Sequence, residues 1–112
     1  MKTHNATEAE PVLRECLVFR EKAASGDWQT FDTQSLLGGS LLEQKRYAEA
    51  EAYLVTGYEG MKQRQNSIPS QDEGRLKEAA DRVVQLYEAW GKPDRAAEWR
   101  QKLSGAKGSP QP

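Results

Sequence analysis

Two adjacent glycines, Gly38 and Gly39, lie inside a segment that otherwise follows a helical pattern, SLLGGSLLEQKRYAEAEAYL at 35–54. Each glycine costs about 1 kcal/mol relative to alanine in a helix interior. Close approach of a second helix would explain a missing side chain at such a position. We therefore expect the packing of this helix against a neighbour to require at least one of the two glycines.

Apolar residues recur at helical spacing in five segments, and no segment alternates with the period of two that is typical of strands. Thr7 with Glu10, and Ser70 with Glu73, predict capping boxes at the starts of the first and fourth helices. Asp27 is the expected cap of the second helix. The predicted helices cover about 8–24, 28–44, 48–61, 71–90 and 93–103. The short turns between them predict an all-α fold with antiparallel neighbours.

The chain contains an internal repeat, because TEAEPVL at 7–13, AEAEAYL at 48–54 and DRAAEWR at 94–100 can be superposed. Alanines fall in register at Ala9, Ala50 and Ala96. The latter two follow a helix and a tight turn, EQKRY in one case and AWGKP in the other. The repeat consists of a half unit at 7–24 and full units at 27–66 and 70–103. Outside it, we expect a frayed start at 1–6 and a disordered tail at 104–112.

The segment LLGGSLLEQKRYAEAEAYL resembles a tetratricopeptide repeat. The family pattern has small, aromatic or large apolar residues at fixed positions. The matching residues are Leu37, Gly38, Leu41, Tyr47, Ala50 and Leu54, then Tyr87, Gly91 and Ala96 in the next unit. In that unit Val83 replaces the leucine of the pattern and Val84 departs from its glycine. The resemblance implies that Gly38 faces the second helix of its hairpin near Ala50. Gly39 would then face the groove, or it reflects simple sequence drift. The resemblance covers about 7–103 and implies antiparallel hairpins stacked as a short superhelix of about five helices, with a concave face that binds a peptide or protein segment.

Two more specific likenesses follow from longer stretches of the chain. The run AEPVLRECLVFREK is similar to repeats of the kinesin-light-chain type. The series from DWQTF to WRQKL resembles the C-terminal repeat region of planctomycete-type bacterial serine/threonine protein kinases. The chain has no glycine-rich phosphate loop, no His-Arg-Asp and no Asp-Phe-Gly sequence. The second hypothesis is therefore a regulatory or structural repeat segment of such a kinase, separated from its catalytic domain.

The family alignment places the binding groove between the first helices of the two full units. Its expected lining is Asp32, Ser35, Gly39, Leu42 and Glu43 from one helix, with Glu78, Asp81, Gln85 and Glu88 from the other. Most of these side chains are acidic, so a basic or polar peptide is the expected ligand. The main hypothesis is a protein-interaction scaffold without catalysis.

Composition argues against the other function classes. A formal net charge of -1 gives no field that would attract nucleic acid, and no apolar run approaches the roughly 20 residues of a membrane span. His4 and Cys16 are the only histidine and cysteine. We therefore expect no enzyme activity, cofactor or metal site. One cysteine fits a reducing compartment, which favours the cytoplasm.

The first predicted helix carries more apolar surface than one neighbour can cover. Leu13, Leu17, Val18 and Phe19 spread over much of its circumference. We expect an exposed apolar strip on this helix. Such a strip is either a site of self-association or the edge left by an absent upstream helix.

Overall fold

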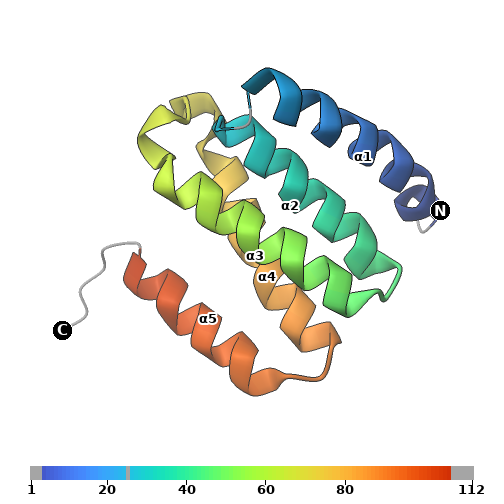
Figure 1. Cartoon of the computed structure of the whole chain (residues 1–112). Helices are drawn as coiled ribbons and strands as arrows, with labels where there is room; N and C mark the ends of the chain where they lie inside the picture. Colours follow the sequence, from blue (N-terminus) through green and yellow to red (C-terminus); the bar gives the residue numbers. More distant parts are fainter. Residues whose placement is uncertain (1–3, 25, 107–112) are drawn as a thin grey trace.

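The structure is a computed structural model that describes the chain over 4–24 and 26–106. Its helices are α1 (His4–Ala24), α2 (Trp28–Glu43), α3 (Tyr47–Gln63), α4 (Glu73–Ala89) and α5 (Pro93–Ala106), shown in Figure 1. Two short 3-10 turns, Gln65–Ser67 and Ser70–Asp72, connect α3 to α4. The described part of the chain contains no strand, and the predicted all-α class is confirmed. None of its helices is long and apolar enough to cross a membrane.

Helix α2 is central to the packing, because it contacts α1, α3 and α4. In Figure 1, α1, α2 and α3 lie side by side in chain order, and α4 passes behind α3. Helix α5 packs mainly on α4. The fully buried apolar side chains from the middle three helices form one core: Leu37, Leu41, Ala50, Leu54, Met61, Ala79, Val83 and Leu86. Their burial accounts for the helical spacing of apolar residues in the sequence.

The α2–α3 and α4–α5 turns have the same backbone geometry. Each contains one residue with positive φ, Lys45 (65°) in the first turn and Gly91 (77°) in the second. In both, that residue's N–H donates to the carbonyl three positions back, and the next N–H donates to the carbonyl five positions back. These two hydrogen bonds define the Schellman motif. The turns are separated by the same offset as Ala50 and Ala96, so the predicted repeat has a counterpart in the backbone.

Gly38 faces α3, as the sequence predicts. A Cβ atom at this position would lie 2.6 Å from Cγ of Leu54 and 3.0 Å from its backbone nitrogen. The neighbour is therefore Leu54, one helical turn beyond the expected Ala50. Gly38 and Leu54 are both buried. The absent side chain lets Leu54 pack directly against the α2 backbone.

Helix α3 contributes two more glycines to the same contact. A Cβ at Gly57 would lie 2.8 Å from the backbone oxygen of Phe31, and one at Gly60 would overlap the Phe31 ring. The sequence GYEG at 57–60 was the available signal for this contact, and the predicted packing did not include it. Small residues on both helices therefore allow α2 and α3 to lie close together.

Neither predicted capping box forms. Helix α1 begins at His4, so Thr7 lies inside it, and Ser70 lies in a 3-10 turn before α4 begins at Glu73. Asp27 is the N-cap of α2, as predicted, although its side chain makes no capping hydrogen bond.

Glu10 has a different role from the one that the capping box assigned to it. Its carboxylate accepts hydrogen bonds from Arg14 Nε (2.9 Å), Gln44 Nε2 (3.0 Å) and Arg46 Nη1 (2.7 Å). Gln44 and Arg46 belong to the α2–α3 turn, so this carboxylate joins α1 to the first full hairpin. The hydrogen bond from Gln44 is the largest cause of a lowered pKa at Glu10, with further contributions from Arg14 and Arg46 that outweigh partial burial.

The ends of the chain depart from the predicted boundaries. Residues 4–6 belong to α1 rather than to a frayed start. Helix α5 continues to Ala106, so the disordered tail predicted from residue 104 is wrong for 104–106. The remaining parts of both predictions, 1–3 and 107–112, lie outside the described residues.

Candidate functional site

Two residues of the predicted groove are buried between α2 and α4. Asp32 is 7% exposed and Ser35 is 0% exposed. Arg75 Nη1 lies 2.7 Å from Oδ2 of Asp32, and Arg82 Nη1 donates to Oγ of Ser35 at 2.9 Å. The prediction that these two side chains line an open surface is therefore wrong. The side chains are covered because the arginines of α4 reach across and occupy this side of α2.

Asp32 is held in an environment that opposes its charge. Burial raises the pKa of its carboxyl group, and the charges of Arg75 and Arg82, with the Arg75 hydrogen bond, act in the opposite direction. The negative charge of the carboxylate is thus compensated by arginines of the same chain. It contributes little to any attraction of a basic ligand.

The other three predicted residues of α2 lie in different surroundings. Gly39 is half-buried, and a Cβ there would lie 3.2 Å from Cδ of Arg82, so this glycine faces α4. Leu42 is half-buried against the core. Glu43 is exposed. Gly39 therefore makes room for an arginine of the neighbouring helix.

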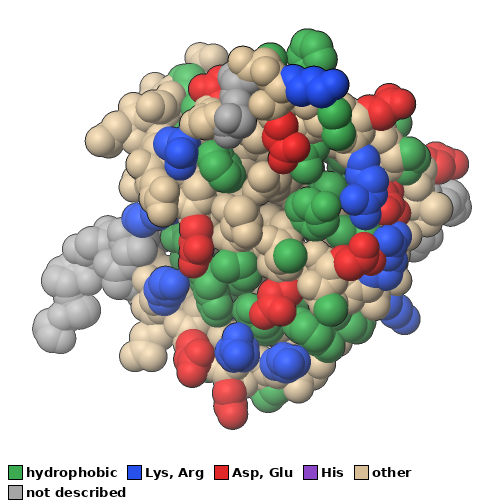
Figure 2. Space-filling model, in the orientation of Figure 1, with side chains coloured by type: hydrophobic (Ala, Val, Ile, Leu, Met, Phe, Trp, Pro, Cys, Tyr) green, Lys and Arg blue, Asp and Glu red, His purple; other side chains and the backbone are tan. Residues whose placement is uncertain are grey.

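The four predicted residues of α4 form one exposed stripe: Glu78, Asp81, Gln85 and Glu88. Two of the acids are paired, Asp81 with Lys77 at 3.3 Å and Glu88 with Arg100. With Asp32 also paired, only two of the five predicted groove acids, Glu43 and Glu78, have no ion pair among the described residues. Figure 2 shows positive and negative side chains interspersed over the face in view. The basis for expecting a basic ligand is therefore largely removed.

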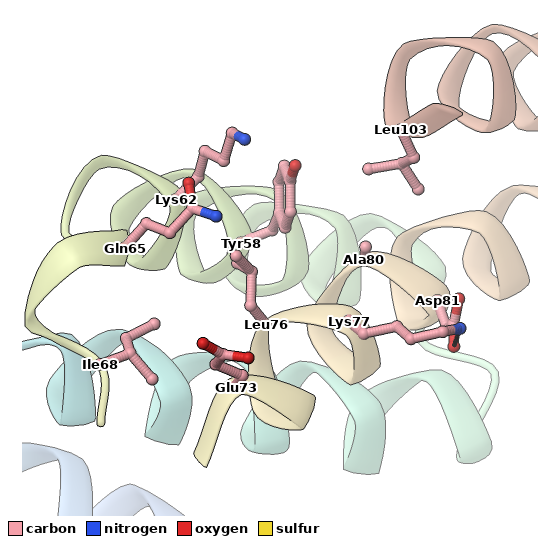
Figure 3. A pocket seen from close by; sticks show the side chains of 10 residues that line it. All are labelled: Tyr58, Lys62, Gln65, Ile68, Glu73, Leu76, Lys77, Ala80, Asp81 and Leu103. Atoms are coloured by element: carbon pink, nitrogen blue, oxygen red, sulfur yellow. Dashed lines mark hydrogen bonds and ion pairs between the residues drawn. The ribbon is translucent and has the colours of Figure 1, made fainter. Parts of the chain in front are cut away.

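A pocket that the sequence prediction did not include lies between α3, α4 and α5. It has a volume of about 470 Å³. Its lining, shown in Figure 3, is Tyr58, Lys62, Gln65, Ile68, Glu73, Leu76, Lys77, Ala80, Asp81 and Leu103. Only Asp81 is shared with the predicted groove. Pockets of this size accommodate small molecules or individual side chains of a bound peptide.

The pocket has an apolar interior and a charged rim. Tyr58, Ile68 and Ala80 are 5–7% exposed, and half-buried Leu76 and Leu103 complete the apolar part. The rim carries both signs of charge, from Lys62, Lys77, Glu73 and Asp81. No lining residue is a serine, threonine, cysteine or histidine. The arrangement is suited to binding an apolar group rather than to nucleophilic chemistry.

The loop from α3 to α4 holds the pocket open. Ile68 is buried in the core and anchors the loop. Arg64 fixes its start, because its Nε donates to the carbonyl oxygen of Gly26 at 2.5 Å and its guanidinium lies 4.6 Å from the centre of the Phe31 ring. This long connection keeps the first turn of α4 apart from the end of α3. The space between them forms one side of the pocket.

Tyr58 forms the wall between α3 and α5. Its ring meets Trp99 edge to face, with centroids 5.6 Å apart and an interplanar angle of 78°. In Figure 3 this ring stands between Lys62 and Leu103. Burial, with a smaller effect of Glu59, raises the pKa of the Tyr58 hydroxyl. The hydroxyl is protonated at neutral pH, as in an ordinary tyrosine, and can donate a hydrogen bond to a ligand.

Within the described residues, no group of three or more His, Cys, Asp and Glu side chains could hold a metal ion. Cys16 is a free, half-buried cysteine on α1. Comparisons with protein-family models, with curated proteins and with solved structures found no match to this chain. The pocket and the helical packing are therefore the features that bear on function.

Proposed function

We propose that this chain is a non-catalytic protein-interaction module built from tetratricopeptide-like hairpins. It binds an apolar segment of a peptide or protein in the pocket between α3, α4 and α5. The observation that carries the proposal is the pocket itself, about 470 Å³ with an apolar interior. Free Cys16 accords with a cytoplasmic location for such a module.

The repeated turn supports the repeat part of the proposal. The α2–α3 and α4–α5 hairpins share one Schellman geometry and place Ala50 and Ala96 at equivalent, buried positions. In stacked hairpins of this kind each unit contacts only its neighbours. The stack as a whole therefore stays elongated and presents an extended surface that can bind a partner. Helix α5 packs mainly on α4, and Leu103 lines the pocket from α5.

The rim of the pocket indicates the chemistry of the ligand. Lys62 and Glu73 have no ion pair among the described residues, whereas Lys77 and Asp81 are paired with each other. A ligand that inserts one or two apolar side chains can therefore place an acidic group at Lys62 and a basic group at Glu73. The proposed ligand is a segment with an apolar centre and charges of both signs beside it, rather than a uniformly basic one.

A random peptide library displayed on phage, selected against the purified chain, tests this function. Ala80→Leu should fill the pocket, because Ala80 lines it. Ala97→Leu, at an exposed position of α5, adds the same volume outside it. We expect selected peptides to bind Ala80→Leu at least about tenfold more weakly and Ala97→Leu unchanged, since filling the site removes the main apolar contact. No enriched peptide, or equal binding to both variants, would contradict the proposal and favour a purely structural segment.

A further inference from the structure

The outer face of α1 exposes the largest uncovered apolar side chains of the described chain. Val12, Val18 and Phe19 are 64%, 53% and 71% exposed. Leu13 and Leu17 belong to the packed side of the helix, Leu13 half-buried and Leu17 buried. The predicted exposed strip is therefore confirmed. Large apolar side chains that cluster on one surface mark an interaction site.

Exposed residues on this face follow a heptad spacing. Glu8, Val12, Glu15, Phe19 and Lys22 are separated by steps of four, three, four and three residues, and all five are exposed. This spacing keeps side chains on one seam of a helix that packs against another helix. At a rise of about 1.5 Å per residue the seam is about 21 Å long. Its apolar members therefore lie between an acidic end and a basic end.

The charge order makes the seam complementary to itself when a second copy runs in the opposite direction. With the two-fold axis at Glu15, Glu8 lies opposite Lys22 of the second copy and Val12 lies opposite Val18 of the second copy, with Phe19 one residue further along. A parallel arrangement of the two copies would instead place Glu8 against Glu8 and Lys22 against Lys22. No ion pair engages Glu8 or Lys22 among the described residues, so both are free to form one. A two-fold interface requires this kind of self-complementary patch.

We propose that the outer face of α1 is the interface of a weak antiparallel homodimer. The apolar contacts and the two Glu8–Lys22 pairs hold the copies together. The two Glu15 side chains meet at the axis and limit the affinity, because like charges repel there. The seam is short, so we expect a dissociation constant of roughly 0.1 mM, at the weak end of specific association. This proposal is independent of the pocket, which no residue of α1 lines.

Sedimentation equilibrium from about 10 μM to 1 mM at low salt tests the association. Phe19→Glu should make the chain monomeric over this range, because it places a charge in the apolar contact beside Val12 and Val18. Its circular dichroism spectrum should be unchanged, since Phe19 is outside the core. Glu15→Gln should tighten the dimer by about threefold or more, because it removes the repulsion at the axis.

Charge reversals distinguish a second copy from any other occupant. Glu8→Lys alone and Lys22→Glu alone should each weaken the dimer about three- to tenfold, and an equimolar mixture of the two variants should restore it. Glu21→Lys is the matched control, because Glu21 is exposed on the opposite side of the helix from Val12 by its spacing. A parent chain that stays monomeric at 1 mM, association that survives Phe19→Glu, or a mixture that fails to restore the dimer would each overturn the proposal.

Discussion

Lys45 and Gly91 occupy the same position in two turns whose backbone hydrogen bonds correspond residue for residue. Glycine adopts positive φ without steric cost, whereas lysine does not. The second hairpin therefore has the residue that this turn favours, and the first accepts strain at the same point. The rest of the first hairpin, in which α2 and α3 share the most extensive contact in the molecule, compensates for that cost.

Lys45→Gly should stabilise the protein. The substitution removes the steric cost of a φ of 65° at an exposed position, and the added freedom of the unfolded chain offsets part of the gain. We expect an increase of about 0.5–1 kcal/mol in the free energy of unfolding, measured by urea denaturation. Gly91→Ala is the inverse control and should lose about 1 kcal/mol. Equal effects of the same sign would contradict the assignment of the two turns to one motif.

Gly38→Ala and Gly39→Ala should have opposite outcomes although the two residues are adjacent. A Cβ at Gly38 meets the side chain and backbone of Leu54, so we expect a loss of about 1–3 kcal/mol. A Cβ at Gly39 meets only the side chain of Arg82, which can move, and alanine favours the helix by about 1 kcal/mol. Gly39→Ala should leave the melting temperature unchanged or raise it. A larger loss at Gly39 than at Gly38 would contradict the described orientation of α2.

Glu10→Gln should destabilise the protein near neutral pH and have little effect in strong acid. The hydrogen bonds from Gln44, Arg14 and Arg46 lower the pKa of Glu10 in the folded state. Its contribution is therefore complete above the ordinary pKa of a glutamate and is lost as the pH falls through that value towards the lowered one. We expect a loss of about 1–2 kcal/mol near pH 7, from urea denaturation at several pH values. A difference between parent and variant that does not change with pH would contradict this role.

Arg75→Gln should destabilise the protein more near pH 7 than near pH 4. The substitution leaves the buried Asp32 carboxylate with one cationic neighbour fewer, and its already raised pKa should rise further. A folded-state pKa above the unfolded value means that stability falls as the pH rises through that interval. The expected loss near neutral pH is about 1–3 kcal/mol. Arg95→Gln, at an exposed position of α5 where the guanidinium lies 5.7 Å from the centre of the Tyr87 ring, is the control and should not show this difference between pH 4 and pH 7.

Local sequence signals predicted most of the helical framework. Asp27, Gly91 and Pro93 marked helix ends because their effects act within one turn of the backbone. The cost of Gly38 in a helix indicated a close contact, the family resemblance assigned the partner helix, and that partner helix is confirmed. The exposed apolar face of α1 also followed from spacing, since Val18 and Phe19 could not share one side with Leu17.

Contacts between distant residues were outside the reach of local patterns. Glu10 matched a capping box, but its partners Gln44 and Arg46 lie 34 and 36 positions away. The sequence pattern assigned Asp32 to an open groove. It could not show that Arg75, from another helix, lies against this carboxylate. The pocket was missed because it depends on the path of the loop between α3 and α4, which no repeat pattern specifies.

The most direct measurement of the central claim, that the pocket between α3, α4 and α5 binds an apolar peptide segment, is methyl NMR. The chain would be titrated with a peptide obtained from the library selection. The claim predicts that the largest shift changes occur at the methyl groups of Ile68, Leu76, Ala80 and Leu103, all of which line the pocket. Changes concentrated at Leu42, which belongs to the groove expected from sequence, or at Val12 and Val18 on α1, with the pocket methyl groups unaffected, would contradict it.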